Sequence, residues 1–442
     1  MKQLDSRWLL PVLILLYSMN FMDRSVLSIV GDALKADLSL SDGELGLLHS
    51  VLLITLIFLI IPGAALCDVL GRRRMLAIAA GLWTGAMALT GTAAGLVHLI
   101  GARALGSINE ASVGAGGNAW LASWYPAEKR GRCIGIFQMS APLGMALGTL
   151  LGGVILAWTG SWRAAFFLFI VPGLFCVLTV PRLPDRQAPA GKGYFRALPK
   201  LLKIRTLVFC GLGAGCYCIV KFAYQTWLPV LIMRSYEGIS PWMAGAMAGS
   251  FLLMGAAGPV IGGSFSDWCA RRGPSGRIRA IVACLGLVAA SKFVLYWMTG
   301  LVPLSVLFAY GLFDGLLTMA PLPIYFTIAQ DVVEDRFRAG ACGLMGGIIY
   351  LTGGAWGPLL VGFFSDSFGG GAQGLRMAEL VLLAFLLVSM LIFSLAAGSY
   401  ARERRTDAEA ASPDGTDPAG AAGTSGAAAS AAGAMSASCA AD

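Results

Sequence analysis

Charged residues are scarce in this chain. Only 13% of its 442 residues are Asp, Glu, Lys or Arg, whereas 57% are hydrophobic and the mean hydropathy is +0.75. Soluble domains carry roughly a quarter of charged residues, because a folded surface in water needs them. The shortage therefore excludes a water-soluble globular protein and indicates a chain whose main solvent is lipid.

Histidine is scarcer still, and the motifs of common enzyme classes are missing. His49 and His98 are the only histidines and cannot form an HExxH zinc motif, and neither a Walker phosphate loop nor a GxSxG elbow occurs. The ten cysteines are scattered, and Cys216 and Cys218 lie in an apolar segment at a spacing that suits neither zinc nor a disulfide framework. These absences argue against an enzyme, and we expect no cofactor and no metal.

What the chain has instead is a series of apolar segments with short polar breaks between them. Each segment is close to the roughly 20 residues that a helix needs to cross a bilayer. They predict about twelve transmembrane helices, at 9–31, 44–66, 75–97, 98–124, 132–157, 163–180, 206–232, 240–265, 278–300, 303–327, 338–364 and 375–398. We therefore expect an all-α polytopic membrane protein.

One long polar break divides these segments into two equal sets. The break, residues 181–205, includes a short amphipathic run that we expect on the membrane surface. It predicts an N-terminal bundle at 1–180, a C-terminal bundle at 206–400 and a linker between them. From about Arg402 the composition shifts to Ala, Gly, Ser, Asp and Pro, so we expect a disordered tail over 401–442.

The two halves also repeat polar motifs at corresponding places. Asp68, Arg72 and Arg73 after the second predicted helix are matched by Asp267, Arg271 and Arg272 after the eighth. Glu128, Arg130 and Arg132 are matched in the same way by Glu334, Arg336 and Arg338. The repetition predicts two pseudo-symmetric six-helix bundles with a substrate between them near the bilayer midplane.

Basic residues set the predicted orientation. Net charge is +8, and most of the 32 Lys and Arg fall on the side of the membrane that holds both termini. Cytoplasmic loops carry such an excess, so we expect both termini in the cytoplasm. This distribution explains the positive net charge, and we expect no nucleic-acid partner. The first apolar run lacks a small-residue cleavage site and is interpreted as a retained helix of a multi-pass plasma (inner) membrane protein.

Polar side chains inside the helices are the candidates for a site, because an ionised group near the bilayer centre costs about 2.5–3.5 kcal/mol. The first and fourth predicted helices carry Asn20, Asp23, Arg24, Arg103, Asn109, Glu110 and Asn118. Arg103 and Glu110 lie two turns apart on one face, and Asp23 is at a similar depth to Glu110. The two helices are predicted to share one polar site.

Two interpretations of this site stay open. The acids and arginines can form ion pairs that only fix helix packing. Alternatively, an acid beside an arginine can exchange a proton for a bound anion. We favour the second, because Gly and Ala would provide packing without burying charge.

The second half contains fewer such groups. Tyr217, Lys221 and Tyr224 form a stripe on the seventh predicted helix, for which binding and packing are both open. We predict that Lys221 pairs with Asp314 of the tenth helix across the cavity in at least one conformational state. Lys292 of the ninth helix is expected to reach the outer interface.

Glycines mark one predicted contact between helices. Gly144, Gly148 and Gly152 recur at four-residue spacing on the fifth helix. Small residues at this spacing let a neighbouring helix approach closely, so we expect rigid packing there.

Several of these motifs resemble those of a known family, the major facilitator superfamily. Asp68-x-x-Gly71-Arg72-Arg73 resembles its signature loop after the second helix, and Arg103 with Gly106 resembles its fourth-helix signature. Other segments are similar to the anion:cation symporters and their spinster-like relatives: Asn20-Phe-Met-Asp23-Arg24, Leu40 to Gly46, Arg103 to Ser112, Trp162-Arg163, Gly357-Pro358 and Ser365-Asp366. The resemblance covers the chain to about Tyr400.

This resemblance implies roles for individual residues. Asp23 and Glu110 stand at the protonation sites, with Arg24 and Arg103 supporting them or an anionic substrate. The residues assigned to substrate binding are Asn20, Arg24, Arg103, Lys221, Tyr224, Gln225 and Asp314. The residues assigned to gating are Asp68, Arg72, Arg73, Asp267, Arg271 and Arg272, and Asp68 is expected to hold a cytoplasmic gate shut.

The predicted function is proton-coupled symport of a small organic anion, a carboxylate or sugar acid, by alternating access. Its partners are then the anion, protons and the lipid bilayer, and we expect a monomer. A spinster-like carrier of lysolipids or other amphiphiles, a proton-coupled exporter and a sensor that transports nothing stay open as alternatives. The polar group of Lys221, Tyr224 and Gln225 argues against a lipid cavity.

Overall fold

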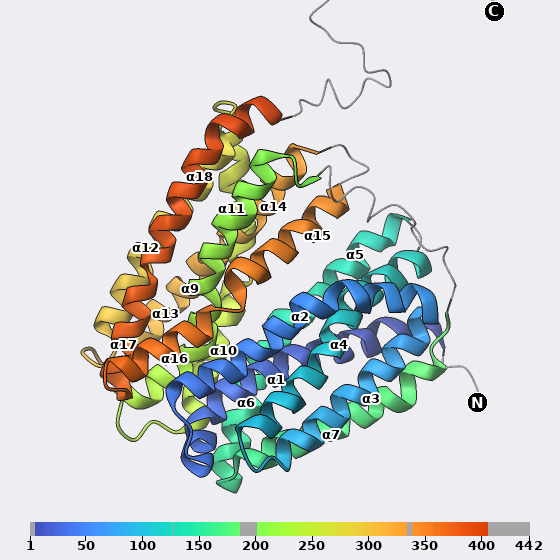
Figure 1. Ribbon diagram of the computed structural model, residues 1–442, viewed down its shortest axis with the longest axis vertical. Coiled ribbons are helices and arrows are strands. Elements are labelled where there is room, and N and C mark those ends of the chain that lie inside the picture. The colour runs from blue at the N-terminus through green and yellow to red at the C-terminus, as the bar shows by residue number, and fades with distance from the viewer. Residues whose placement is uncertain (1–4, 126, 186–200, 334–337, 405–442) are drawn as a thin grey trace, which may run out of the picture. The chain divides into compact units, whose positions relative to one another are not determined.

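The computed structural model describes residues 5–125, 127–185, 201–333 and 338–404, and within these ranges all regular structure is helical. The first half contains α1 (Leu9–Leu38), α2 (Asp42–Leu70), α3 (Arg72–Gly91), α4 (Leu96–Trp124), α5 (Ala127–Gln138), α6 (Ser140–Thr159) and α7 (Trp162–Thr179) (Figure 1). The second half contains α9 (Arg205–Ser235), α10 (Pro241–Gly255), α11 (Gly258–Ala270), α12 (Gly276–Met298), α13 (Leu304–Met319), α14 (Pro321–Asp331), α15 (Arg338–Ile349), α16 (Gly357–Ser367), α17 (Gly371–Leu382) and α18 (Ala384–Glu403). Short turns η1 (Ser6–Trp8), η2 (Val180–Arg182) and the π-helical η4 (Tyr350–Gly354) complete the regular structure.

The helices confirm the prediction of a polytopic all-α membrane protein. Ten stretches of the described chain are long and apolar enough to cross a membrane. The helices α3 and α4 add two more segments of 20 and 29 residues, and α4 holds Glu110 midway along its length with Arg103 two turns earlier. Ten and two make the twelve spans that the apolar runs predict.

Several predicted helices are interrupted. Pro321 begins α14, and Pro358 lies in the first turn of α16. Proline lacks an N–H, so it is tolerated at the start of a helix but interrupts a helix that would otherwise continue. The first helix departs in the other direction. It was expected to end at residue 31, yet α1 runs to Leu38 and stops at Ser39, whose φ of 54° is left-handed.

Each half packs mainly on itself. In the first half α1 lies on α6, α4 on α2 and α3, and α3 on α7; in the second, α9 and α12 both lie on α18 (Figure 1). Residues Met1–Arg404 form one compact unit. The predicted tail beyond Arg404 and most of the predicted linker lie outside the described residues, so the predicted domain boundaries stay predictions.

The two halves meet through the helix pairs α2–α16 and α6–α10. Glycines make these contacts. Gly46 lies against the carbonyl of Pro358, and Gly245 against the carbonyl of Thr149, so closely that a Cβ would overlap the oxygen. These contacts lie toward the end of the molecule where α1 joins α2, here called the Ser41 end; the end that holds the termini is called the linker end.

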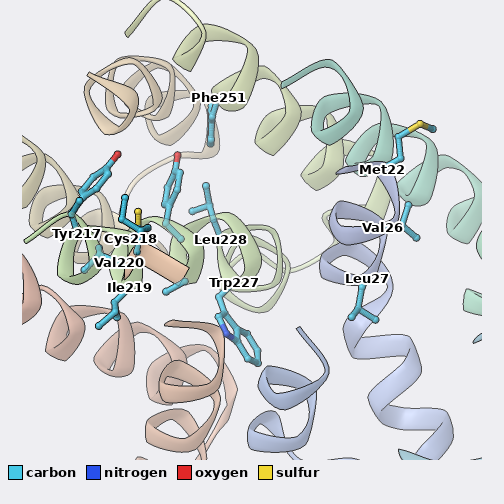
Figure 2. Close-up of a cluster of buried hydrophobic side chains, with 14 of the residues drawn as sticks. Met22, Val26, Leu27, Tyr217, Cys218, Ile219, Val220, Trp227, Leu228 and Phe251 are labelled. Atoms are coloured by element: carbon cyan, nitrogen blue, oxygen red, sulfur yellow. The ribbon is translucent and has the colours of Figure 1, made fainter. Parts of the chain in front are cut away.

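The predicted glycine stripe on the fifth helix is confirmed as a packing surface. Gly144, Gly148 and Gly152 of α6 face Ser18, Met22 and Val26 of α1 in turn, at distances that leave little or no room for a Cβ. Figure 2 shows Met22 and Val26 pointing toward this neighbouring helix.

An apolar core surrounds α9, which lies at the centre of the second half. Figure 2 shows Tyr217, Cys218 and Trp227 along this helix, with Phe251 of α10 nearby. The Trp227 ring is buried, and its Nε1 donates to the carbonyl of Pro358 at 3.0 Å. The nine cysteines within the described ranges are all free thiols.

Candidate functional site

Two ion pairs join α1 to α4. Arg24 donates from Nη2 to both carboxylate oxygens of Glu110, at 2.7 and 2.6 Å, and Arg103 Nη1 donates to Asp23 Oδ2 at 2.8 Å. Consecutive side chains of a helix point about 100° apart, so Asp23 and Arg24 do not face each other. Each pairs instead with a residue of α4. As predicted, the two helices bring these four groups together.

An amide pair extends this site. Asn109 Nδ2 donates to Asn20 Oδ1 at 2.9 Å, and both side chains are buried. Asn118 is separate, because its amide donates to the carbonyl of Gly114 on its own helix.

The site contains buried polar atoms that make no hydrogen bond to any described residue. Several buried polar atoms here have no partner within the described part of the chain: Asn20 Nδ2, Arg24 Nε, His49 Nδ1, Arg103 Nη2 and Gln225 Nε2. An unpaired buried donor costs about 1–3 kcal/mol. A ligand rich in acceptor oxygens would remove this cost.

A small cavity lies beside Arg24, between the two halves. Its polar lining comes from Arg24, Ser25, Ser28, His49, Gln225 and Thr226, and its apolar lining from Leu53, Met145, Phe222, Leu252 and Pro358. The free space is about 20 Å³, room for about one water molecule. The Arg24 guanidinium lies between the rings of Phe21 and Phe222, 5.8 and 5.9 Å from their centroids, and so faces the second half. A larger ligand enters only if the helices part.

The predicted Lys221–Asp314 pair is not formed in this conformation. Asp314 Oδ2 instead accepts from Lys292 Nζ at 2.5 Å, and Lys221 Nζ lies 5.1 Å from the Phe222 ring centroid. The expectation that Lys292 reaches the membrane surface is wrong, because the Lys292 side chain is 0% exposed. The face of α12 that carries Lys292 packs on α13, so the ammonium finds its partner inside the second half.

The remaining predicted binding residues separate into two places. Gln225 lines the cavity beside Arg24. Tyr224 does not, because its ring lies under Lys292 Nζ, 2.9 Å from the centroid. Asp314 and Tyr224 thus belong to a second polar group, whereas Asn20, Arg24, Arg103 and Gln225 stay with the first.

The predicted gating residues at the linker end act within their own halves. Arg72 Nη1 donates to the Ala119 carbonyl at 2.9 Å and to Ser123 Oγ at 2.7 Å, which ties the α2–α3 turn to α4. Asp267 pairs with Arg277 at 2.6 Å.

The other gating predictions are less well defined. The Arg272 guanidinium stacks 3.3 Å from the Trp268 centroid, Arg271 is exposed and Arg73 is half-buried. The side chains of Asp68, Glu128, Arg130, Arg132 and Arg338, and residues Glu334 and Arg336 as a whole, lie outside the described part of the structure.

A charged network at the Ser41 end was not predicted from the sequence. Arg234 at the end of α9 donates to Asp32 of α1 and to both oxygens of Asp42 of α2, at 2.6–3.2 Å. Lys35 also donates to Asp42, at 2.6 Å. Asp366 of α16 accepts from the backbone N–H groups of Asp42 and Gly43, and so caps α2 from the other half.

Part of this network was visible in the sequence. Ser41 and Glu44 form a capping box that begins α2, and the S-x-x-E pattern predicts such a start. Nothing in the pattern indicates that a third acid, Asp366, arrives from a segment more than three hundred residues later. His49 was considered only for a zinc motif that it cannot form, and its buried ring lines the cavity.

No group of three or more His, Cys, Asp or Glu side chains that could hold a metal ion occurs within the described ranges. The arrangement is instead suited to binding an anion and exchanging protons. Charges buried between helices, beside a space that opens only when the helices part, are typical of membrane transporters.

Comparison with known proteins agrees with this class. The chain matches the model of the Major Facilitator Superfamily over residues 13–358. It is 30% identical over 388 residues to the hexuronate transporter of Bacillus subtilis, covering 81% of this chain and 89% of that protein. It is also 29% identical over 411 residues to an MFS-type efflux pump of Mycolicibacterium smegmatis, covering 89% of this chain and 92% of the pump.

A solved structure shares the fold. It is a bacterial homologue of the human lysosomal transporter Spinster in an inward-facing and unoccupied conformation, with a TM-score of 0.81 and 22% identity, covering 91% of this chain and 99% of that one. The chain is therefore a multi-pass membrane transporter. It belongs to the Major Facilitator Superfamily.

Proposed function

We propose that this protein is a proton-coupled symporter of a small sugar acid. The observation that carries the proposal is the Arg24–Glu110 pair beside the cavity, with Arg24 Nε still unpartnered in the described part of the chain. A guanidinium holds a carboxylate through two parallel hydrogen bonds, which suits the acid group of such a substrate. The polar atoms of His49, Gln225 and Asn20 are suited to the hydroxyl groups of a sugar.

The proposed coupling follows from competition for one cation. A substrate carboxylate that binds Arg24 displaces the Glu110 carboxylate, and Glu110 then takes up a proton because a buried charge without a partner is costly. Anion and proton therefore favour each other's binding, and this coupling is reciprocal. Asp23, which is held by Arg103 and does not line the cavity, is the other proton acceptor of this first polar site.

The proposed orientation places the Ser41 end outside the cell and both termini in the cytoplasm, as the distribution of basic residues predicts. The conformation then has its external end closed by the Arg234 network and the α2–α16 and α6–α10 contacts. Uptake from outside requires this end to open.

Sugar acids are preferred over amphiphiles as the substrate. The hexuronate transporter is similar over most of its length, and the cavity places Arg24, His49 and Gln225 together. A lysolipid tail would have to pass this polar group. The spinster-like carrier and the exporter therefore remain as the competing outcomes of the test.

The test is transport by the purified chain in liposomes. With the interior alkaline, we expect accumulation of radiolabelled glucuronate or galacturonate that a proton uncoupler abolishes, and no such signal from protein-free liposomes. Transport of lysophospholipid without any hexuronate uptake would show that the substrate assignment is wrong. Hexuronate uptake that ignores the pH gradient would refute the proton coupling alone.

A further inference from the structure

A second group of ionisable side chains is buried in the second half. Lys292 of α12, Asp314 of α13 and Glu379 of α17 are each 0% exposed. The group holds two carboxyls and one ammonium, and none of the three lines the cavity beside Arg24. The proposed function gives these residues no role.

Hydrogen bonds divide the two carboxyls unequally. Asp314 accepts from Lys292 Nζ at 2.5 Å through one oxygen and from Ser291 Oγ at 2.7 Å through the other. Neither oxygen of Glu379 has a hydrogen-bond partner in the described residues. An ionised carboxylate without donors is among the costliest groups in an apolar interior, whereas a neutral carboxylic acid is tolerated. Asp314 is therefore the charged member of the two.

The groups that face Glu379 come from neighbouring helices. The helix α17 packs on α9, α12, α16 and α18. Lys292 and Tyr296 of α12 face the Glu379 carboxyl, and Tyr224 of α9 lies close enough to interact with it and with Asp314. Lys292 thus bonds Asp314 and is close enough to Glu379 to interact with it, and its Nζ lies 2.9 Å from the centroid of the Tyr224 ring.

We propose that Glu379, Lys292 and Asp314 form a second proton-binding site, in which Glu379 carries the proton in this conformation and Lys292 is shared between the two carboxyls. The reaction is the addition of one proton to the Glu379 carboxylate, and no other bond changes. Loss of that proton requires Lys292 to turn from Asp314 toward Glu379.

The helix α9 connects this site to the cavity. Phe222, Gln225 and Thr226 of α9 line the cavity, while Tyr224 of the same turn supports Lys292. A movement of α9 that opens the cavity also shifts Tyr224. The shift changes whether the Lys292 ammonium pairs with Asp314 or with Glu379. Proton binding at Glu379 therefore depends on the conformation of the transporter.

Infrared spectroscopy of the full-length purified protein tests the proposal without substrate or gradient, so its outcome is independent of the proposed function. At neutral pH we expect a C=O stretch of a protonated carboxyl that disappears in Glu379→Gln and persists in Glu110→Gln. The Gln side chain matches a neutral Glu in shape, so the variant is expected to fold. If Glu379→Gln leaves the carboxyl spectrum unchanged, Glu379 is ionised and the proposal is wrong.

Two further measurements separate a shared, exchangeable proton from a permanently neutral acid. In Asp314→Asn the lysine is released to pair with Glu379, and we expect the Glu379 band to be lost at neutral pH; a persisting band overturns the shared lysine. In the wild type, which needs no folding control, the band should fade and return reversibly as pH is raised and lowered. A band that stays constant until the protein unfolds overturns the proton exchange.

Discussion

Arg24 and Arg103 have similar partners but different surroundings. Arg24 is 15% exposed and lines the cavity, whereas Arg103 is 4% exposed and does not. An entering anion therefore meets the Arg24–Glu110 pair first. Both pairs are part of the first polar site, yet only one of them can exchange its carboxylate for a substrate without a larger rearrangement.

The first prediction concerns the acids of this site. Glu110→Gln and Asp23→Asn should each abolish accumulation driven by a pH gradient, because an amide cannot carry the proton, while exchange of internal for external substrate persists. Uptake by the wild type should fall as external pH rises. Uptake and counterflow in liposomes measure both quantities.

Control and refutation use the same assay. Arg163→Gln breaks a half-exposed pair with Asp37 at the Ser41 end and should leave the coupling unchanged. Full pH-driven accumulation by the double variant Asp23→Asn, Glu110→Gln would falsify the mechanism.

The second prediction concerns Lys292, Asp314 and Lys221. Lys292→Met should lower the free energy of unfolding by about 3–5 kcal/mol, because it leaves buried acids without their cation. Adding Asp314→Leu should recover a large part of this loss. Adding Asp314→Leu to Lys221→Met should recover nothing, since Lys221 lies elsewhere. Thermal unfolding and expression measure the effect, and equal rescue in both pairs would contradict the observed pairing.

At the scale of helices, the contact between halves is made by residues without side chains. Gly46 and Gly362 allow α2 and α16 to touch through their backbones, and Gly153 and Gly245 do the same for α6 and α10. Each half contributes at least one glycine to each contact. Close approach of this kind brings many weakly attracting atoms together, and a single Cβ prevents it.

The third prediction follows from this contact. Gly245→Leu should cost the closed arrangement about 1–3 kcal/mol through overpacking, and so increase opening at the Ser41 end roughly tenfold. The rate of labelling of Ser28→Cys, in a background without other cysteines, reports the opening, because Ser28 lines the cavity. Gly85→Leu is the control, since a Cβ there meets nothing within 4 Å. Equal labelling in both variants would show that the contact does not hold this end closed.

At the scale of the whole molecule, one arginine connects three helices. Arg234 of α9 bonds Asp32 of α1 and Asp42 of α2, and so links the second half to two helices of the first. Asp42 is 0% exposed and also accepts from Ser365 of α16 at 2.8 Å. Charge and glycine contacts therefore act at the same end.

The fourth prediction is that Arg234→Gln favours opening of the Ser41 end. The change leaves Asp42 with Lys35 as its remaining cation and removes the charge that joins the halves. Labelling of Ser28→Cys from the Ser41 side should then accelerate. Arg163→Gln, which breaks a pair inside the first half, should have no such effect. An unchanged rate in Arg234→Gln would mean that the glycine contacts suffice.

The fifth prediction concerns topology. Six predicted spans precede Gly191 and six more separate it from Arg405, so both positions lie on the same side as the N-terminus. Tags at Gly191 and after Arg405 should therefore be cytoplasmic, and a tag near Ser41 should be external. Accessibility of the tags in intact and permeabilised cells measures this. Opposite sides for Gly191 and Arg405 would contradict the helix count.

The sequence alone determined the class of fold and the members of the first polar site. Water and lipid each demand a distinct composition, so apolar runs of bilayer length are readable without any tertiary information. The cost of charge in lipid likewise made Asp23, Arg24, Arg103 and Glu110 conspicuous. The seven-residue spacing of Arg103 and Glu110, with the similar depth of Asp23 and Glu110, was enough to predict that α1 and α4 share one site.

Only the tertiary structure decided which charge meets which. A buried lysine pairs with the acid that packing brings within about 3 Å, and sequence position does not say which acid that is, so Asp314 was assigned to Lys221 rather than Lys292. The partner of Arg234, Asp42, could not be predicted from sequence position either. No local sequence pattern marks Glu379 as a buried acid. Pairings between distant segments depend on helix rotation and on glycines that allow backbones to touch, and these are set by the packing of the whole bundle.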